Sequence, residues 1–177
     1  MTVSIALLRG INVGGNRSVR MAELAGVFVA LGCGDVRTYI QSGNVVFADG
    51  SRSEAALVED LQRGIEQATG FDVAVVVRTA EAWADVVAQN PYPGVEPTHL
   101  HVSFLADAPA ASEVEAIDHA AFAPEQFSVV GRQVYLHLPH GMGRAKLPVV
   151  LGRTLLRSPA TTRNWRTVEK LLALASD

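Results

Sequence analysis

The sequence has little cysteine, few aromatic residues and no long apolar run, and each shortage excludes a class of protein. The single cysteine, Cys33, excludes an internal disulfide framework and a cysteine-rich zinc site. Only 6% of the residues are aromatic, which leaves little material for stacking nucleic-acid bases. Apolar runs such as residues 73–77 have the length of a strand and are far shorter than a membrane span. The apolar run at residues 3–8 has no basic residue before it, so we expect no signal peptide and a cytoplasmic location.

Acidic residues are absent from two stretches of the chain, although the formal net charge is only −3. Residues 1–20 contain three arginines and no acid, and residues 126–168 contain seven basic residues and no acid. Residues 21–125 contain 16 acids against four arginines, which gives them a charge of −12. Such an uneven distribution favours an anionic partner, and it argues against a uniformly basic nucleic-acid-binding surface.

Apolar runs and helical stripes alternate in the first part of the chain. Enrichment in β-branched residues predicts strands at residues 3–8, 36–40, 45–48 and 71–77. Apolar residues at helical spacing, followed by glycine, predict helices at residues 21–31 and 57–68. The resulting order, βαββαβ, is that of a ferredoxin-like unit.

The rest of the chain repeats this order loosely. We expect helices at residues 79–88 and around 112–119, strands at 99–105, 127–130 and 133–138, and final helices at 147–157 and 163–175. No last strand is obvious in this half. We therefore predict an α+β fold made of duplicated ferredoxin-like (βαββαβ) units, with antiparallel sheets and two C-terminal helices. The predicted units are residues 1–78 and residues 79–177.

The start of the last predicted helix has an unusual distribution of charge. Thr161 and Thr162 suit N-cap positions, which places Arg163 and Arg166 in the first turn. Positive charge at this end opposes the helix dipole. A bound anion would explain the two arginines. The alternative is that they face water or pair with acids from the middle of the chain.

Three stretches of the sequence are distinctive: residues 7–15, residues 39–47 and residues 160–165. In these stretches, and over essentially its whole length, the chain resembles a bacterial family, domain-of-unknown-function family 1697. The resemblance implies an α+β duplication of ferredoxin-like units and implies no activity. Pro148 departs from the family pattern, which affects where the following helix starts. The family's signature positions correspond to Arg9, Gly10, Asn12, Gly14, Gly15, Gln41, Ser42, Gly43, Asn44, Lys146, Leu147, Thr162, Arg163, Asn164 and Trp165.

The loop at residues 10–18 contains three glycines and could hold a phosphate with its backbone amides, next to Arg9 and Arg17. It lacks the Gly-Lys-Ser/Thr end of a Walker A motif, and it does not match the dinucleotide-binding fingerprint. The alternative is that this loop only joins a strand to a helix. The polar run at residues 41–44 has the same alternative, a plain tight turn.

Other chemistry has little support in the sequence. Cys33 follows the C-terminal end of a predicted helix, where the dipole would raise the thiol pKa, and Ser42 lacks a nucleophile elbow. His99, His101, His137 and His140 could ligate a metal, or they could lie on an outward strand face. We assign no metal and no cofactor, and we leave open whether the chain is an enzyme.

We hypothesise that the chain binds a phosphorylated or other anionic small ligand, such as a nucleotide or a phosphate ester. One alternative is shape-based nucleic-acid (RNA) binding through residues 126–168, although the strand at residues 44–48 offers only Phe47 for stacking. Another alternative is a protein-interaction module that forms a homodimer between basic and acidic faces, and we expect no membrane partner. The predicted binding residues are Arg9, Asn12, Gly14, Gly15, Gln41, Ser42, Gly43, Asn44, Lys146, Thr162, Arg163, Asn164 and Trp165.

Overall fold

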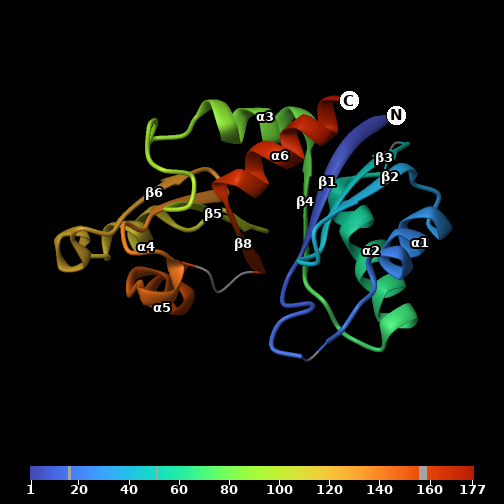
Figure 1. The fold of residues 1–177 in the computed structure, drawn as a ribbon, viewed down its shortest axis with the longest axis horizontal. Coiled ribbons are helices and arrows are strands. Elements are labelled where there is room, and N and C mark those ends of the chain that lie inside the picture. The colour runs from blue at the N-terminus through green and yellow to red at the C-terminus, as the bar shows by residue number, and fades with distance from the viewer. Residues whose placement is uncertain (16, 51, 156–158) are drawn as a thin grey trace. The chain divides into compact units, whose positions relative to one another are not determined.

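The computed structural model describes residues 1–15, 17–50, 52–155 and 159–177. The chain divides into two compact units, which we treat separately. Unit 1 comprises Met1–Asp85 together with Leu171–Asp177, and unit 2 comprises Val86–Lys170. Each unit contains one four-stranded antiparallel sheet (Figure 1). Helices α3 (Ala80–Ala88) and α6 (Trp165–Ser176) each begin in one unit and end in the other.

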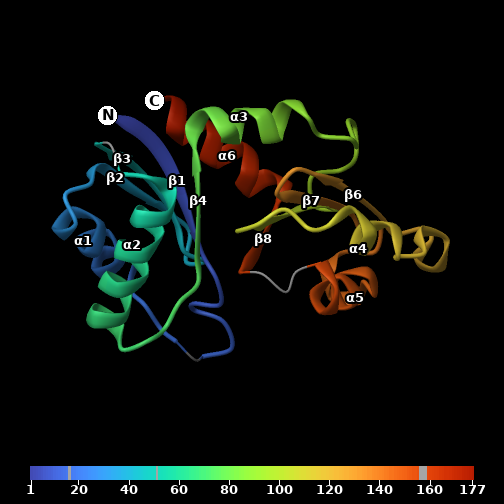
Figure 2. The same ribbon diagram turned by 180° about the vertical axis from the view of Figure 1, so that it is seen from behind.

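Unit 1 has the element order βαββαβ, and its strands lie in the order β2-β3-β1-β4. Helices α1 and α2 lie side by side on one face of this sheet (Figures 1 and 2). Strands β2 and β4 form its two edges. The elements are β1 (Thr2–Leu8), α1 (Met21–Ala30), β2 (Gly34–Tyr39), β3 (Asn44–Asp49), α2 (Glu54–Thr69) and β4 (Val75–Thr79).

The core of unit 1 lies between the two helices and the sheet. Alternate residues of each strand face it, because successive side chains in a strand point to opposite faces. The rings of Phe28 on α1 and Phe47 on β3 meet edge to face, with their centroids 5.0 Å apart. Gly64 lets α1 and α2 approach closely, since a Cβ atom there would lie 3.0 Å from Val27. Other buried core residues are Ala6, Leu8, Leu24, Val45, Leu57, Leu61, Ile65, Val75 and Val77.

Unit 2 repeats the element order, and its strands lie in the equivalent order β6-β7-β5-β8. The predicted α+β class, with antiparallel sheets and the ferredoxin-like order of elements, is confirmed. Two short 3₁₀ turns, η1 (His119–Phe122) and η2 (Met142–Arg144), lie between the main elements. The main elements are β5 (Leu100–Leu105), α4 (Ala111–Glu115), β6 (Gln126–Val130), β7 (Gln133–His137), α5 (Leu147–Arg153) and β8 (Ala160–Asn164).

The prediction that the last helix begins near Arg163 is wrong. Residues 160–164 form strand β8, which pairs antiparallel with β5 from Leu105 opposite Ala160 to His101 opposite Asn164. Threonine suits an N-cap, and it also suits a strand because its Cβ is branched. The pairing with β5 makes these residues a strand. Helix α6 therefore starts at Trp165 and is capped by Asn164, whose Oδ1 accepts a 2.9 Å hydrogen bond from the Thr167 backbone N–H.

Two other predicted helices differ in extent. The helix expected around residues 112–119 is replaced by the short α4 and by η1, because Asp118 has an extended backbone and caps η1 with its side chain. Helix α5 ends at Arg153, whereas the prediction continued to residue 157. Residues 156 and 157 lie outside the described part of the chain. None of the described helices combines the length and the hydropathy that a membrane crossing requires.

Candidate functional site

The predicted glycine-rich loop and the predicted hairpin turn lie together at one end of the unit 1 sheet. We refer to residues 9–15, 17–20 and 40–43 as the loop cluster. The Leu8 backbone N–H donates a 2.8 Å hydrogen bond to the Gly43 carbonyl oxygen. The Asn12 side chain donates a 2.8 Å hydrogen bond from Nδ2 to the Gln41 carbonyl oxygen. The structure thus brings together the two predicted stretches that belong to unit 1.

Asn12 holds the glycine-rich loop in shape. Its Nδ2 also donates to the Val19 carbonyl oxygen at 2.9 Å, and its Oδ1 accepts from the Val19 backbone N–H at 2.8 Å. The backbone of Asn12 has φ 55°, a left-handed conformation that asparagine tolerates better than most residues. Asn12 therefore positions the loop, and its side-chain amide is already engaged by the protein.

The hairpin residues 42–44 also have structural roles. Gly43 has φ 78°, and a Cβ atom there would lie 2.7 Å from the Leu8 Cβ and 2.9 Å from the Ile11 Cδ1. Asn44 is fully buried, and its Nδ2 donates 2.9 Å hydrogen bonds to the Tyr39 carbonyl oxygen and the Ser42 Oγ. The polar run that looked like a binding motif is therefore explained by the close approach and closure of the turn.

The exposed residues of the loop cluster include three arginines and the adjacent glycines Gly14 and Gly15. Arg9, Gly14 and Gly15 are exposed, and the two glycines have φ 63° and 76°. Arg17 is also exposed, and its Nη1 donates a 3.1 Å hydrogen bond to the Asp72 carbonyl oxygen. Among the residues that the structure describes, Arg9 and the exposed Arg20 form no side-chain hydrogen bond or ion pair. Their positive charge is therefore not neutralised by a direct contact with a described residue.

Ile40 is a residue of the loop cluster that the sequence did not single out. It has φ 48° and is half exposed. A β-branched residue in the left-handed region is a genuine outlier, and such strain concentrates at functional sites. Val13, beside Asn12, is also largely exposed. Nothing in the local pattern around an isoleucine at the end of a strand would reveal this backbone conformation.

In unit 2, the N-terminus of α5 already has an acidic partner. The carboxylate of Glu125 accepts hydrogen bonds from the backbone N–H groups of Lys146 and Leu147, at 3.0 Å and 2.7 Å. A carboxylate at this position also suits the helix dipole. Lys146 is exposed. Because Glu125 already accepts from the backbone N–H groups here, a ligand would meet the ammonium group of Lys146.

Thr162 and Arg163 point to opposite faces of the unit 2 sheet, because they are neighbours in a strand. The Thr162 Oγ1 lies 2.6 Å from the Ser103 Oγ. Arg163 is only 9% exposed, and its Nη1 donates to the Thr161 Oγ1 and to the Thr162 carbonyl oxygen, at 2.7 Å and 2.9 Å. Burial lowers the pKa of Arg163 to about 10. The predicted basic helix N-terminus formed by Thr162 and Arg163 is therefore wrong.

Asn164 and Trp165 complete this part of the predicted site. Asn164 is exposed but uses its side-chain oxygen as the cap of α6, and Trp165 is buried at the first turn. Their use in one site with Arg9, as the sequence suggested, stays a prediction.

The acid-free stretch at residues 126–168 is less uniformly basic in the structure than in the sequence. Arg163 is buried, and the half-buried Arg132 donates to the Ala106 carbonyl oxygen at 3.1 Å. Arg166 lies 3.8 Å from a carboxylate oxygen of Glu96. Of the remaining described cations, Arg144, Lys146 and Arg153 are exposed. This distribution gives less support to a phosphate-tracking nucleic-acid surface than the sequence alone.

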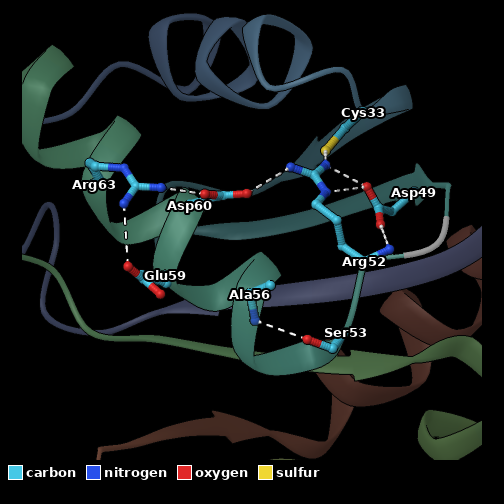
Figure 3. Close-up of polar contacts among 8 residues, drawn as sticks. All are labelled: Cys33, Asp49, Arg52, Ser53, Ala56, Glu59, Asp60 and Arg63. Atoms are coloured by element: carbon cyan, nitrogen blue, oxygen red, sulfur yellow. Dashed lines mark hydrogen bonds and ion pairs between the residues drawn. The ribbon is translucent and has the colours of Figure 1, made fainter.

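Cys33 belongs to a structural polar network in unit 1 (Figure 3). Arg52 donates to the carboxylates of Asp49 and Asp60 and, through Nη2, to the Cys33 Sγ at 3.3 Å. Burial raises the pKa of the Cys33 thiol, whereas the hydrogen bonds from Arg52 lower the pKa of Asp49. Arg63 extends the network on α2 by pairing with Asp60 and Glu59 (Figure 3). A buried thiol with a raised pKa is a poor nucleophile.

The histidines of unit 2 were the candidate metal ligands. Within the described ranges, no three histidine, cysteine or acidic side chains are grouped closely enough to hold a metal ion. Burial and the neighbouring His99 lower the pKa of His101, and the same two causes lower the pKa of His137. The His101 Nδ1 is buried and has no hydrogen-bond partner among the described residues.

The loop cluster lies within the part of the chain that matches a protein-family model. The family model described as a protein of unknown function (DUF1697) matches residues 1–135. The chain belongs to this family. The predicted resemblance is thereby confirmed, and the match to DUF1697 contains the first two distinctive stretches and ends before Lys146.

The fold of this DUF1697 protein also occurs in a solved structure, that of the conserved bacterial protein SP0830 from Streptococcus pneumoniae. The TM-score is 0.82 at 23% sequence identity, and the alignment covers 100% of this chain and 99% of that chain. At this level of identity the similarity shows the fold alone. A search of curated proteins found no match.

Proposed function

We propose that this DUF1697 protein binds a phosphorylated or other anionic small ligand, such as a nucleotide or a phosphate ester, at the loop cluster of unit 1. The observation that carries the proposal is that Arg9, Arg17 and Arg20 are exposed in the same loop as the exposed pair Gly14 and Gly15. The sequence provides no acid in residues 1–20 to neutralise them.

The chemistry of these groups suits a phosphate. Gly14 and Gly15 have no side chains, so an anion can approach the backbone N–H groups closely. A guanidinium group offers paired donors that match two oxygens of one phosphate. Two acids lie nearby, Glu23 in the first turn of α1 and Asp72, whose carbonyl oxygen accepts from Arg17, so three arginines still leave an excess of positive charge.

Hydrogen bonds of the Asn12 side chain support the loop in the absence of a ligand. Two hydrogen bonds join the Asn12 side chain to the Val19 backbone within the loop, and a third connects it to the Gln41 carbonyl oxygen of the hairpin. A preorganised loop pays less ordering entropy on binding than a free one. In this proposal, Asn12, Ser42, Gly43 and Asn44 shape the site. The exposed residues Arg9, Gly14, Gly15 and Gln41 would contact the ligand.

A thermal-shift experiment tests this proposal. The wild type and two variants would be heated with inorganic phosphate, pyrophosphate, ribose 5-phosphate or ATP. A ligand that binds only the folded state raises the melting temperature by mass action. We expect at least one of the four to raise the Tm of the wild type, and Arg9→Gln to reduce this shift.

The matched control is Arg144→Gln, which removes the same charge from an exposed residue of unit 2. It should keep the wild-type response. The proposal is wrong if none of the four anions raises the Tm, or if both variants lose the response to the same extent.

A further inference from the structure

Edge strand β2 of unit 1 carries an arginine, Arg37, with one buried nitrogen that has no partner among the described residues. Arg37 is half-buried, and its Nε is shielded from solvent without a hydrogen-bond partner among the described residues. Its guanidinium also forms no ion pair within the part of the chain that the structure describes. A buried donor without a hydrogen-bond partner lowers the stability of the folded state. Such a donor in a folded protein therefore suggests a partner that is not part of the chain.

The pairing of β2 with β3 is irregular next to Arg37. The pairing of β2 with β3 shifts register between Gly34, opposite Ala48, and Arg37, opposite Val46. Asp35, inside this irregular segment, has φ 46°. Bulges re-aim side chains and are frequent next to binding sites. The irregular backbone and the unsatisfied side chain therefore occur at the same place.

Arg37 lines a cavity of about 620 Å³ within unit 1. This volume is in the range of small-molecule sites, about 300–1,000 Å³. None of the lining residues belongs to the loop cluster, so the cavity is separate from the anion site proposed above. Its walls combine apolar side chains with charges of both signs: Val3, Ala48, Ala175, Arg37, Asp35 and Asp177.

We propose that this cavity binds a zwitterionic small molecule of the amino-acid class, with a carboxylate, an ammonium group and a short aliphatic part. The guanidinium of Arg37 would take the carboxylate, for which its paired donors are suited. The carboxylates of Asp35 and Asp177 would take the ammonium group. The apolar wall formed by Val3, Ala48 and Ala175 would pack against the aliphatic part.

The charges of both signs in the cavity wall favour a zwitterionic ligand over a simple anion or a simple cation. A simple anion would meet repulsion from Asp35 and Asp177, and a simple cation would meet repulsion from Arg37. A molecule that carries both charges satisfies the two sides together. The structure therefore favours a zwitterion over either singly charged ligand.

Nuclear magnetic resonance on the full-length, ¹⁵N-labelled chain provides the test, because the Arg37 Nε–H gives its own signal. The probes are L-leucine and 6-aminohexanoate as zwitterions, with hexanoate and hexylamine as their singly charged controls. We expect saturable shifts of the Arg37 Nε–H and of the backbone amides of residues 35–37 with at least one zwitterion. Hexanoate and hexylamine should bind at least about tenfold more weakly, because each leaves one charged side of the cavity unpaired.

Three variants show which side chain is responsible. Arg37→Gln should weaken binding of the zwitterion about tenfold or more, since a charge-assisted hydrogen bond is lost. Asp35→Asn, at an exposed residue, should weaken the zwitterion but leave hexanoate unchanged or tighter. Arg144→Gln, in unit 2, should change neither.

Two results would overturn the proposal. Absence of saturable shifts at residues 35–37 with both zwitterions would exclude a zwitterion site in this cavity. Equal affinity for hexanoate and 6-aminohexanoate would remove the role of Asp35 and Asp177. If Arg37→Gln does not fold, the Asp35→Asn variant alone decides, because loss of the zwitterion's advantage over hexanoate supports the site and its retention contradicts it.

Discussion

The side-chain Nδ2 of Asn12 lies 2.8 Å from the carbonyl oxygen of Gln41, which follows it by 29 residues. This hydrogen bond joins the glycine-rich loop after β1 to the hairpin turn before β3. Because β1 and β3 are neighbours in the sheet, the two stretches meet at its end. The loop cluster therefore depends on a side chain that contacts no ligand in our proposal and determines where the exposed groups lie.

Replacement of Asn12 tests this dependence. Asn12→Ala removes three side-chain hydrogen bonds and places a Cβ-bearing residue at φ 55° without their compensation. We expect the free energy of unfolding in urea to fall by about 2–3 kcal/mol. Asn12→Gly loses the same bonds but tolerates the backbone conformation, so it should be less destabilised by roughly 0.5–1 kcal/mol. Stability of both variants within about 0.5 kcal/mol of the wild type would contradict the structural role.

Two glycines of the loop cluster should respond differently to alanine. At Gly43 the new Cβ would collide with Leu8 and Ile11, whereas at Gly14 nothing lies within 4 Å. Both glycines have positive φ, so alanine strains the backbone at both positions. The collision occurs at Gly43 alone of the two. We expect Gly43→Ala to cost about 3 kcal/mol of stability and Gly14→Ala about 1 kcal/mol, measured by urea unfolding. Similar costs at the two sites would show that the close approach at Gly43 is not present.

The network around Arg52 should stabilise unit 1 in a pH-dependent way. Hydrogen bonds from Arg52 lower the pKa of Asp49 in the folded state. The stabilisation is therefore complete above the unfolded pKa of about 3.9 and is lost as the pH falls through the folded pKa. Arg52→Gln should cost about 2 kcal/mol at pH 7, because a nearly buried carboxylate loses its partner, and clearly less at pH 3. Equal costs in urea unfolding at the two pH values would contradict this account.

Two half-buried histidines should make the stability of unit 2 fall with pH in the same direction, but in a higher pH range. Burial lowers the pKa values of His101 and His137, so the folded state favours their neutral forms. Their contribution is complete above the unfolded pKa of about 6.5 and declines as the pH falls towards the folded values. We expect the Tm to decrease from pH 8 to pH 5 in the wild type and to decrease less in His101→Gln. His140→Gln, at an exposed residue, is the control, and identical pH profiles for all three proteins would refute the prediction.

Strands with a clear apolar pattern were predictable from the sequence, whereas β8 was not. Most of its residues are polar, so the strand has no apolar pattern. These residues form a strand because they pair with β5, some 60 residues earlier in the chain. Once residue 163 lies in a strand, alternation turns its side chain inward, which converts an expected surface arginine into a buried one. A local reading of threonines as helix caps misses this long-range pairing.

The candidate site was predictable in part for a similar reason. The ferredoxin-like order places β1 beside β3, so the proximity of residues 7–15 and 39–47 follows from topology. The division of those residues into structural and exposed ones does not follow, because it depends on individual hydrogen bonds such as those of Asn44. The register shift beside Arg37 does not follow either, because the neighbouring residues of the sequence do not reveal it.

Titration of ¹⁵N-labelled protein with inorganic phosphate tests the central claim, anion binding at the loop cluster, most directly. The backbone amide signals of Gly14 and Gly15 report on the glycine pair, and the Nε–H signal of Arg9 reports on the guanidinium. We predict saturable shifts of all three signals in the wild type and loss of the glycine shifts in Arg9→Gln. Unchanged Gly14 and Gly15 signals, or shifts confined to unit 2, would contradict the account.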